Sequence, residues 1–363
     1  MILGIGKNRE PACPNPGLGR ARDEPARSRR FLSPGIANRR LKIAGHAKSR
    51  VSQQVPLATG SQMGIGSFFK SIIDGGKVDI AKRYEILRDA VSGTMSDFHK
   101  ARDRESDQIV GLKILDKEKT EQLEMRFRGL DKPSEGEIAT LFQHPRIVRT
   151  FGYGVTTKGQ QFIVMEYLDG PGLNSLIIGK SKLLDGNRVA LMRQAAESLQ
   201  VVHDAGYIHR DVCPRNFVCS ADATSLKLID FGLTVPSRKE FMQPGIRTGT
   251  PNYMAPEVVR RKPTDQRLDI FAFGVSMYEM FAFDLPWQRG TGDGLAAMSN
   301  GQTQPTPLDK HVPGIHPDIA KAIHHCLDPN PETRTQSMKQ VLSAISQVAH
   351  EQKDHPLNLR RKT

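Results

Sequence analysis

The stretch that decides the fold reads Tyr207-Ile208-His209-Arg210-Asp211-Val212-Cys213-Pro214-Arg215-Asn216. In it, an aspartate follows a basic residue and precedes an asparagine by five positions. This spacing suits a loop that turns back on itself, so that the Asp211 carboxylate faces a hydroxyl group and the Asn216 amide oxygen faces a metal ion. Downstream, a short apolar strand ends in an acid and a flexible glycine, Leu228-Ile229-Asp230-Phe231-Gly232.

Together, the two stretches resemble the catalytic loop and the metal-binding Asp-Phe-Gly segment of the eukaryotic-type (Hanks-type) serine/threonine protein kinases. The resemblance covers Tyr84 to Val348 and implies an α+β, bilobal fold. A small β-rich N-lobe with one key helix would lie over a larger, mainly helical C-lobe. We expect an N-terminal extension over residues 63–83, a kinase domain over 84–349 and a basic polar tail over 350–363.

The positive charge of the chain is unevenly placed. Of the net charge of +13, residues 1–62 carry +9, from twelve Lys or Arg against three Asp or Glu. The basic character therefore describes this segment, and nucleic-acid binding by the folded part is not indicated. Rich in Pro, Gly, Arg and Ser without a period, residues 1–62 are expected to be disordered.

Three accounts of residues 1–62 stay open: a plain basic tail, a transit peptide, or a mis-assigned start with Met63 as the true first residue. The many prolines and glycines oppose the amphipathic helix of a transit peptide, which favours the other two. Four cysteines without Cys-x-x-Cys spacing indicate a reducing compartment. The most apolar stretch, residues 268–287, contains three acids and predicts a buried helix rather than a membrane span. We expect a soluble, cytoplasmic protein.

The segment that begins with Tyr84 predicts a strand and a hairpin. In the kinases, this place holds a glycine-rich loop whose backbone amides approach the ATP phosphates. Only Gly93 remains here, and Val91 and Ser96 stand where the first and third glycines would be. By itself the segment is an ordinary hairpin with a Ser-Gly turn, and by position it is a degenerate phosphate loop. The resemblance implies that Val91, Gly93 and Phe98 line the nucleotide site.

Lys113 lies in the alternating strand pattern of residues 109–115 and resembles the lysine that pairs the α- and β-phosphates. Such a lysine needs a carboxylate from the following helix, and the candidates are Glu135 and Glu137. The family places this glutamate nine residues before the histidine of a His-Pro turn, here His144, which selects Glu135. Glu137 is the alternative and requires a shortened loop.

The buried strand around Met165 resembles the hinge between the kinase lobes. The resemblance places Met165 behind the adenine and assigns the adenine edge to the backbones of Glu166 and Leu168, although simple core packing also explains Met165. Residues 183–205 predict an amphipathic helix that ends at Gly206 and leads into the catalytic loop.

Phosphoryl transfer requires an aligned hydroxyl and cations that neutralise charge. The resemblance implies that Asp211 orients the hydroxyl or accepts its proton. It implies that Asn216 and Asp230 hold Mg²⁺, which prefers oxygen ligands. Phe231 would pack beneath the helix that carries Glu135. The implied partners are ATP and protein substrates with Ser or Thr hydroxyls, including the chain itself.

Cys213 stands where serine/threonine kinases usually carry a lysine that touches the γ-phosphate. Arg215 stands where many tyrosine kinases carry an arginine for a comparable purpose, so we hypothesise that Arg215 supplies the missing charge. The alternative is that Arg215 is exposed or bonds a loop carbonyl. Thr250 resembles the threonine that lines the hydroxyl site of serine/threonine kinases and favours Ser/Thr over Tyr specificity.

Further residues match the scaffold of the family. Asp269 resembles the acid that holds the backbone of the catalytic loop, and Arg334 resembles the partner of Glu257. Arg210 resembles the receptor of a phosphorylated activation loop, for which Thr248 is a candidate.

Two other functions stay open. A pseudokinase that binds nucleotide or partners would explain the departures at Val91, Ser96 and Cys213. A small-molecule phosphotransferase would explain the catalytic loop but not Ala255-Pro256-Glu257, which serves protein substrates.

Overall fold

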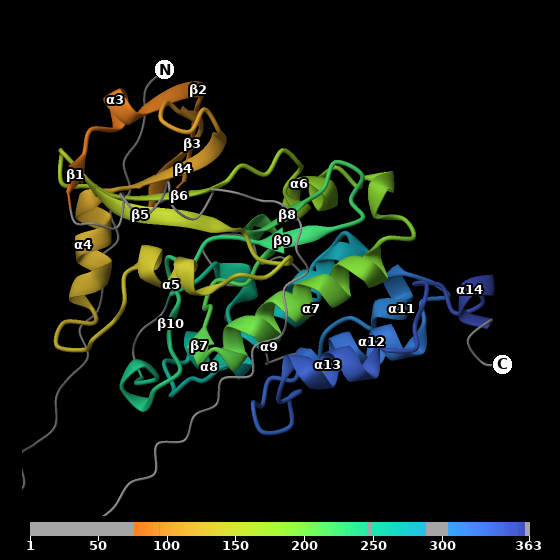
Figure 1. The fold of residues 1–363 in the computed structure, drawn as a ribbon. Coiled ribbons are helices and arrows are strands. Elements are labelled where there is room, and N and C mark those ends of the chain that lie inside the picture. The colour runs from red at the N-terminus through yellow and green to blue at the C-terminus, as the bar shows by residue number, and fades with distance from the viewer. Residues whose placement is uncertain (1–75, 94, 245–247, 288–303, 360–363) are drawn as a thin grey trace, which may run out of the picture. The chain divides into compact units, whose positions relative to one another are not determined.

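The computed structural model describes residues 76–93, 95–244, 248–287 and 304–359. The expectations for residues 1–62 and for a start at Met63 lie outside these ranges. Residues 76–166 build a sheet with three helices, here called the N-lobe, and residues 171–359 build a mainly helical C-lobe (Figure 1). The expected α+β, bilobal architecture, with a β-rich N-lobe and a mainly helical C-lobe, is confirmed.

The N-lobe contains a six-stranded sheet in the order β1-β5-β6-β4-β3-β2. β1 runs parallel to β5, and the other neighbours are antiparallel. The strand expected over residues 109–115 has those bounds. The strands are β1 (Lys77–Val78), β2 (Tyr84–Ser92), β3 (Ser96–Asp103), β4 (Ile109–Leu115), β5 (Thr150–Thr156) and β6 (Gln161–Glu166).

Three helices accompany this sheet: α3 (Ile80–Arg83), α4 (Lys117–Met125) and α5 (Glu135–Leu141). Helix α5 begins with a capping box in which Ser134 accepts from the Glu137 N–H and Glu137 accepts from the Ser134 N–H. Residues 77–83, expected as an extension, contribute to the N-lobe, because β1 extends the sheet and Arg83 pairs with fully buried Asp103 at 2.9 Å.

The C-lobe is built mainly from helices. They are α6 (Leu173–Ile178), α7 (Arg188–Asp204), α8 (Pro256–Val259), α9 (Arg267–Ala282), α11 (Leu308–His311), α12 (Pro317–Cys326), α13 (Met338–Ala344) and α14 (Pro356–Leu359). Two short antiparallel pairs join them, β7 (Tyr207–Ile208) with β10 (Val235–Pro236) and β8 (Phe217–Cys219) with β9 (Leu226–Leu228). Short 3₁₀ turns are η1 (Lys182–Leu184), η2 (Pro214–Asn216), η3 (Lys239–Phe241) and η4 (Pro251–Tyr253).

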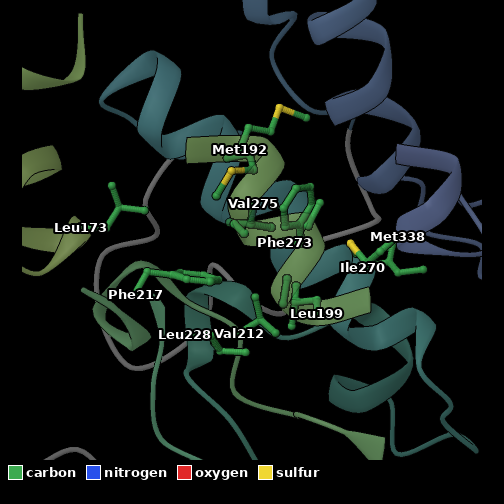
Figure 2. Close-up of a cluster of buried hydrophobic side chains, with 14 of the residues drawn as sticks. Leu173, Met192, Leu199, Val212, Phe217, Leu228, Ile270, Phe273, Val275 and Met338 are labelled. Carbon is green, nitrogen blue, oxygen red and sulfur yellow. The ribbon is translucent and has the colours of Figure 1, made fainter. Parts of the chain in front are cut away.

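The C-lobe core forms between α7 and α9. Figure 2 shows apolar side chains from these helices, from α6 and α13 and from the β8–β9 pair converging there. Helix α9 is buried from Leu268 to Phe281, as expected for the apolar stretch 268–287, although the helix ends at Ala282. Five residues after the end of this helix, the Trp287 ring stacks on Phe271 with ring centroids 5.8 Å apart. Within the described ranges, no helix has the length and apolar character needed to cross a membrane.

Helix α7 starts five residues later than expected. Residues 182–184 form the 3₁₀ turn η1 instead, and Gly186 follows with φ +77°, a left-handed conformation that interrupts the helix. The end agrees with the prediction, because Gly206 has φ +79° just after the last turn. The helix thus delivers the chain into β7 and the catalytic loop.

Residues 349–359 pack on the C-lobe. The Asn358 side chain is 6% exposed; it accepts from the N–H groups of Ala349 and His350 and donates to the carbonyls of His350 and Gln352. Buried Glu351 accepts from the Gly186 N–H at 2.7 Å. In the described part of the tail expected over residues 350–363, these polar groups therefore find partners inside the fold.

Candidate active site

A buried acid of α9 holds the catalytic loop. Asp269, which is fully buried, accepts hydrogen bonds from the backbone N–H groups of His209 and Arg210, both at 2.8 Å. It also bonds His203 Nε2 at 2.9 Å. Arg210 has φ +68°, a strained conformation that persists only where its surroundings fix it. The expected contact of Asp269 with the backbone of the catalytic loop is thus confirmed. The His209 ring packs edge-on against Phe231, with ring centroids 5.5 Å apart.

The Asp211 carboxylate receives four hydrogen bonds. Its Oδ1 accepts from the Thr250 hydroxyl at 2.7 Å and from the Thr250 N–H at 3.0 Å. Its Oδ2 accepts from Asn216 Nδ2 at 3.0 Å and from Arg215 Nη2 at 3.2 Å. The structure therefore brings together four residues that the sequence predicted for one site. These bonds fix the orientation of the carboxylate, and the Asp211 side chain is 10% exposed.

Lys113 lies between two carboxylates. Its Nζ is 2.5 Å from Glu135 Oε1 and 2.9 Å from Asp230 Oδ1. Glu137 instead caps α5 through Ser134, so the choice of Glu135 over Glu137 is confirmed. Burial alone would lower the pKa of Lys113, but Asp230 and Glu135 outweigh it and raise that pKa. Burial would likewise raise the pKa of Asp230, but Lys113 lowers it to about 2. Both groups are thus charged at neutral pH.

The segment after β9 approaches α5 closely. Phe231 is 1% exposed and stacks on Phe142, the residue that follows α5, with ring centroids 5.0 Å apart, as expected. A Cβ added at Gly232 would lie 3.2 Å from Glu135 Oε2, so glycine suits this contact. Asp230 has φ +65° and accepts from the Gly232 N–H at 3.0 Å. This conformation turns the Asp230 carboxylate toward Lys113.

Asn216 and Asp230 lie beside each other because the β8–β9 hairpin joins them. The Ile229 N–H donates to the Asn216 carbonyl at 2.9 Å, one residue before Asp230. The Asn216 amide nitrogen is used by Asp211, which leaves its amide oxygen for another partner. The bonds to Asp230 from Lys113 and Gly232 both end on Oδ1. One amide oxygen and one carboxylate oxygen are hard donors, and this set fits Mg²⁺.

The degenerate phosphate loop is a closed hairpin. Val91 and Phe98 are opposite each other in β2 and β3, and the Gly93 N–H donates to the Ser96 carbonyl at 2.8 Å. The Phe98 ring packs over Gly111, where an added Cβ would lie 2.8 Å from Phe98 Cζ. The sequence analysis did not assign Gly111 to the nucleotide site. The only sequence signal for this close contact was a glycine inside a predicted strand.

The hinge residues lie next to this ring. The same added Cβ at Gly111 would be 3.2 Å from Met165 Cγ, and Met165 is 9% exposed. The Glu166 side chain accepts from the Arg149 N–H at 2.7 Å and pairs with Lys227 Nζ at 2.5 Å. Leu168 packs at the edge of the C-lobe core. Backbone contacts of Glu166 and Leu168 to adenine stay a prediction.

The geometry agrees with what comparison with known proteins finds. A family model described as protein kinase domain matches residues 84–345. The chain belongs to this family. Members use ATP, typically with Mg²⁺.

Curated relatives of this kinase domain come from several bacteria. It is 29% identical over 279 residues to serine/threonine-protein kinase PknB of Mycobacterium tuberculosis, which covers 74% of this chain and 43% of PknB. It is 27% identical over 285 residues to serine/threonine-protein kinase pkn3 of Myxococcus xanthus, covering 76% and 51%. The match to a probable serine/threonine-protein kinase of Clostridium acetobutylicum is 28% identical and covers 74% and 40%. The chain thus spans about half the length of these relatives or less.

The kinase domain departs from the usual lysine at Cys213. The thiol is 1% exposed, and burial raises its pKa to about 12, so Cys213 is neutral. The Thr250 hydroxyl lies 3.6 Å from its sulfur. The Arg215 side chain is 53% exposed and bonds the Asp211 carboxylate rather than a loop carbonyl. Among the described residues, Arg215 is therefore the cation that is bonded to the Asp211 carboxylate.

A contact that the sequence did not reveal positions α5 in the kinase domain. A Cβ added at Gly136 would lie 2.4 Å from both Cβ and Cγ of Tyr153 on β5. Real side chains do not approach so closely, so only glycine lets α5 lie against this ring. Gly136 directly follows Glu135, the partner of Lys113. The Tyr153 ring thus sets how far α5 stands from the sheet.

We expect Gly136→Ala to lower kcat/KM for ATP by about 10²-fold, because the added methyl pushes α5 and Glu135 away from Lys113. Alanine favours helix by about 1 kcal/mol over glycine, so the loss is not explained by a weaker helix. Steady-state kinetics of the single variant and of Gly136→Ala combined with Tyr153→Gly check this. Glycine at position 153 removes both atoms that the methyl would meet, Cβ and Cγ, and restores activity. Equal loss in both variants would contradict the steric explanation.

Proposed function

We propose that the chain is an ATP-dependent serine/threonine protein kinase that transfers the γ-phosphate of ATP to Ser or Thr hydroxyls of proteins, including its own. The observation that carries this is the Asp211 carboxylate, bonded at once to Thr250, Asn216 and Arg215. Beside it, Lys113 is bonded to both Glu135 and Asp230. The names of the curated relatives support Ser/Thr specificity.

The residues of the chain account for the transfer as follows. The substrate hydroxyl takes the place of the Thr250 hydroxyl at Asp211, which accepts its proton as the oxygen attacks the γ-phosphorus. The bond from phosphorus to the bridging oxygen breaks, and ADP leaves. Lys113 binds the α- and β-phosphates and is aimed by Glu135. Asn216 and Asp230 would hold Mg²⁺, which supplies positive charge to the phosphates when bound.

The nucleotide site of the proposal lies under the β2–β3 hairpin. Val91 and Gly93 would approach the phosphates through their backbone, and Phe98 and Met165 would bound the adenine. The Phe98 ring over Gly111 supports a base pocket that is closed on this side. The backbones of Glu166 and Leu168 would bond the edge of the base.

The alternatives explain fewer observations. A pseudokinase has no need of Lys113, Asp211, Asn216 and Asp230 all present and brought to one site. A small-molecule phosphotransferase does not account for the buried ion pair of Glu257 with Arg334, which anchors the segment that follows Thr250.

We expect Arg215→Ala to lower kcat by about 10²-fold or more while the dissociation constant of ATP changes little. Arg215 replaces the positive charge that Cys213 lacks, and this charge acts on the γ-phosphate during transfer. Single-turnover kinetics and titration calorimetry with ATP separate the two quantities. The matched control is Arg238→Ala, an exposed arginine without a contact to Asp211. Unchanged turnover of Arg215→Ala would refute the assignment.

The proposed function is tested by incubating the full chain with radiolabelled ATP and Mg²⁺ beside its Asp211→Asn variant. We expect label on Ser or Thr of the parent protein and none on the variant. Mapping then shows whether Ser237, Thr248 or Thr250 is modified. ATP binding without transfer to itself or to a general protein substrate would favour the pseudokinase.

A further inference from the structure

The positive charge of the kinase domain is concentrated in one stretch. Residues 63–363 together carry +4, the remainder of +13 after the +9 of residues 1–62. Residues 238–262 hold six Lys or Arg against two acids and so carry the same +4 by themselves. The rest of residues 63–363 is therefore neutral in sum, and the excess belongs to the segment that leads from the activation loop to α9.

This stretch lines a surface cavity. The cavity, of about 740 Å³, lies between the turn η3, the loop from α8 to α9 and the segment 329–332. We call it the basic cavity; its polar lining includes Lys239, Gln243, Arg260, Lys262, Thr264 and Asn330. Its two sides are joined where the Thr264 N–H donates to the Met242 carbonyl at 3.1 Å.

The acids of the basic cavity are already neutralised. Glu257 is buried and accepts from Nη1 and Nη2 of Arg334 at 2.7 and 3.0 Å. Asp265 and Glu332 both pair with Arg267, at 2.8 and 3.0 Å. Each carboxylate that lines the cavity is thus held by an arginine, and none is directed to the lysines of the rim.

The basic side chains at the rim of the cavity, in contrast, have no partners among the described residues. Lys239, Arg260 and Lys262 are exposed, and among the described residues none of their side chains forms an ion pair or a hydrogen bond. Three unpaired cations around one concave surface, next to satisfied acids, leave a positive potential there. Because no partner has to be displaced from these cations, an anion can bind there without first breaking an existing ion pair.

We propose that the basic cavity binds an acidic segment, a run of Asp or Glu, of the protein substrate. The cavity is lined by Met242, Gln243 and Glu257, which flank in sequence the segment that brings Thr250 to Asp211. Its size exceeds that of one side chain and matches a short peptide stretch. This proposal rests on the proposed kinase function and adds to it that the protein substrates carry an acidic segment.

Binding is measured without catalysis, by fluorescence anisotropy of a labelled poly-glutamate peptide and a poly-glutamine peptide of equal length, with the full chain. The variant is Lys239→Glu/Arg260→Glu/Lys262→Glu. The matched control, Lys180→Glu/Lys182→Glu/Lys339→Glu, changes three exposed lysines outside the cavity and shifts the net charge equally. A further variant with glutamine at 239, 260 and 262 removes charge without adding any, and thermal melts verify folding of each.

We expect the parent to bind poly-glutamate more tightly than poly-glutamine, and the variant with three glutamates to lose affinity for poly-glutamate by at least about tenfold. The affinity of the glutamine variant should lie between those of the parent and the glutamate variant. The control should bind as the parent does. A parent that binds both peptides equally, or a control as weak as the variant, would overturn the proposal. The kinase function is separated by a second readout, phosphorylation of a serine peptide flanked by glutamates or by glutamines. Preference in binding with no phosphorylation of either peptide would refute the kinase function and leave the acidic site standing.

Discussion

Lys113→Met is expected to lower kcat/KM for ATP by about 10²–10³-fold. Methionine keeps the length of the side chain and removes the charge that Glu135 and Asp230 share at 2.5 and 2.9 Å. Two carboxylates then face each other without a cation, and the pKa of Asp230 rises from about 2. Steady-state kinetics over a range of ATP concentrations measure the loss.

The matched control for this variant is Lys117→Met, which alters an exposed lysine at the start of α4 by the same substitution. We expect its kinetics to equal those of the parent. Far-UV circular dichroism of both variants verifies that the fold is kept. A Lys113→Met protein with turnover within a few-fold of the parent would exclude the proposed role of Lys113.

The second large effect concerns stability. Arg334→Met is expected to lower the free energy of unfolding by about 3–5 kcal/mol, because it leaves the buried Glu257 carboxylate without its partner. The guanidinium also donates to the carbonyls of Arg267 and Asp328, both at 2.8 Å, and these lose a donor too. Urea unfolding followed by circular dichroism measures the change.

The double variant Glu257→Leu/Arg334→Met serves as the control. It removes the unpaired charge as well, so we expect it to be more stable than Arg334→Met alone. Failure to recover any stability in the double variant would show that the lost carbonyl bonds, rather than the orphaned carboxylate, cause the loss.

Much of the kinase domain could be predicted because its chemistry is carried by residues in short, ordered motifs. Asp211, Asn216 and Asp230 are fixed by local spacing, and the nine-residue separation from His144 selected Glu135 over Glu137 correctly. The apolar face of α7 and the buried helix α9 follow from periodicity and composition, since burial imposes both. These features are local in sequence, and local rules suffice for them.

Contacts between distant segments could not be predicted in this way. Two such contacts, of Tyr153 with Gly136 and of Phe98 with Gly111, depend on how strands and helices approach each other. A glycine in the sequence does not indicate which aromatic ring packs against it. The bond from Asn358 to the backbone around His350 was missed for a related reason. A polar composition near a chain end indicates solvation unless a fold supplies partners, and only the structure shows them.

Because Trp287 stacks on Phe271 in the C-lobe core, its intrinsic fluorescence can be used to follow unfolding of that core. Trp287 is the single tryptophan of the sequence and is 7% exposed. The Arg334 guanidinium lies over the same Phe271 ring, 5.0 Å from its centroid. Intrinsic emission at the tryptophan wavelength therefore comes from one indole, three contacts away from the Glu257 carboxylate through Phe271 and Arg334. It reports opening of the C-lobe core in an unlabelled protein.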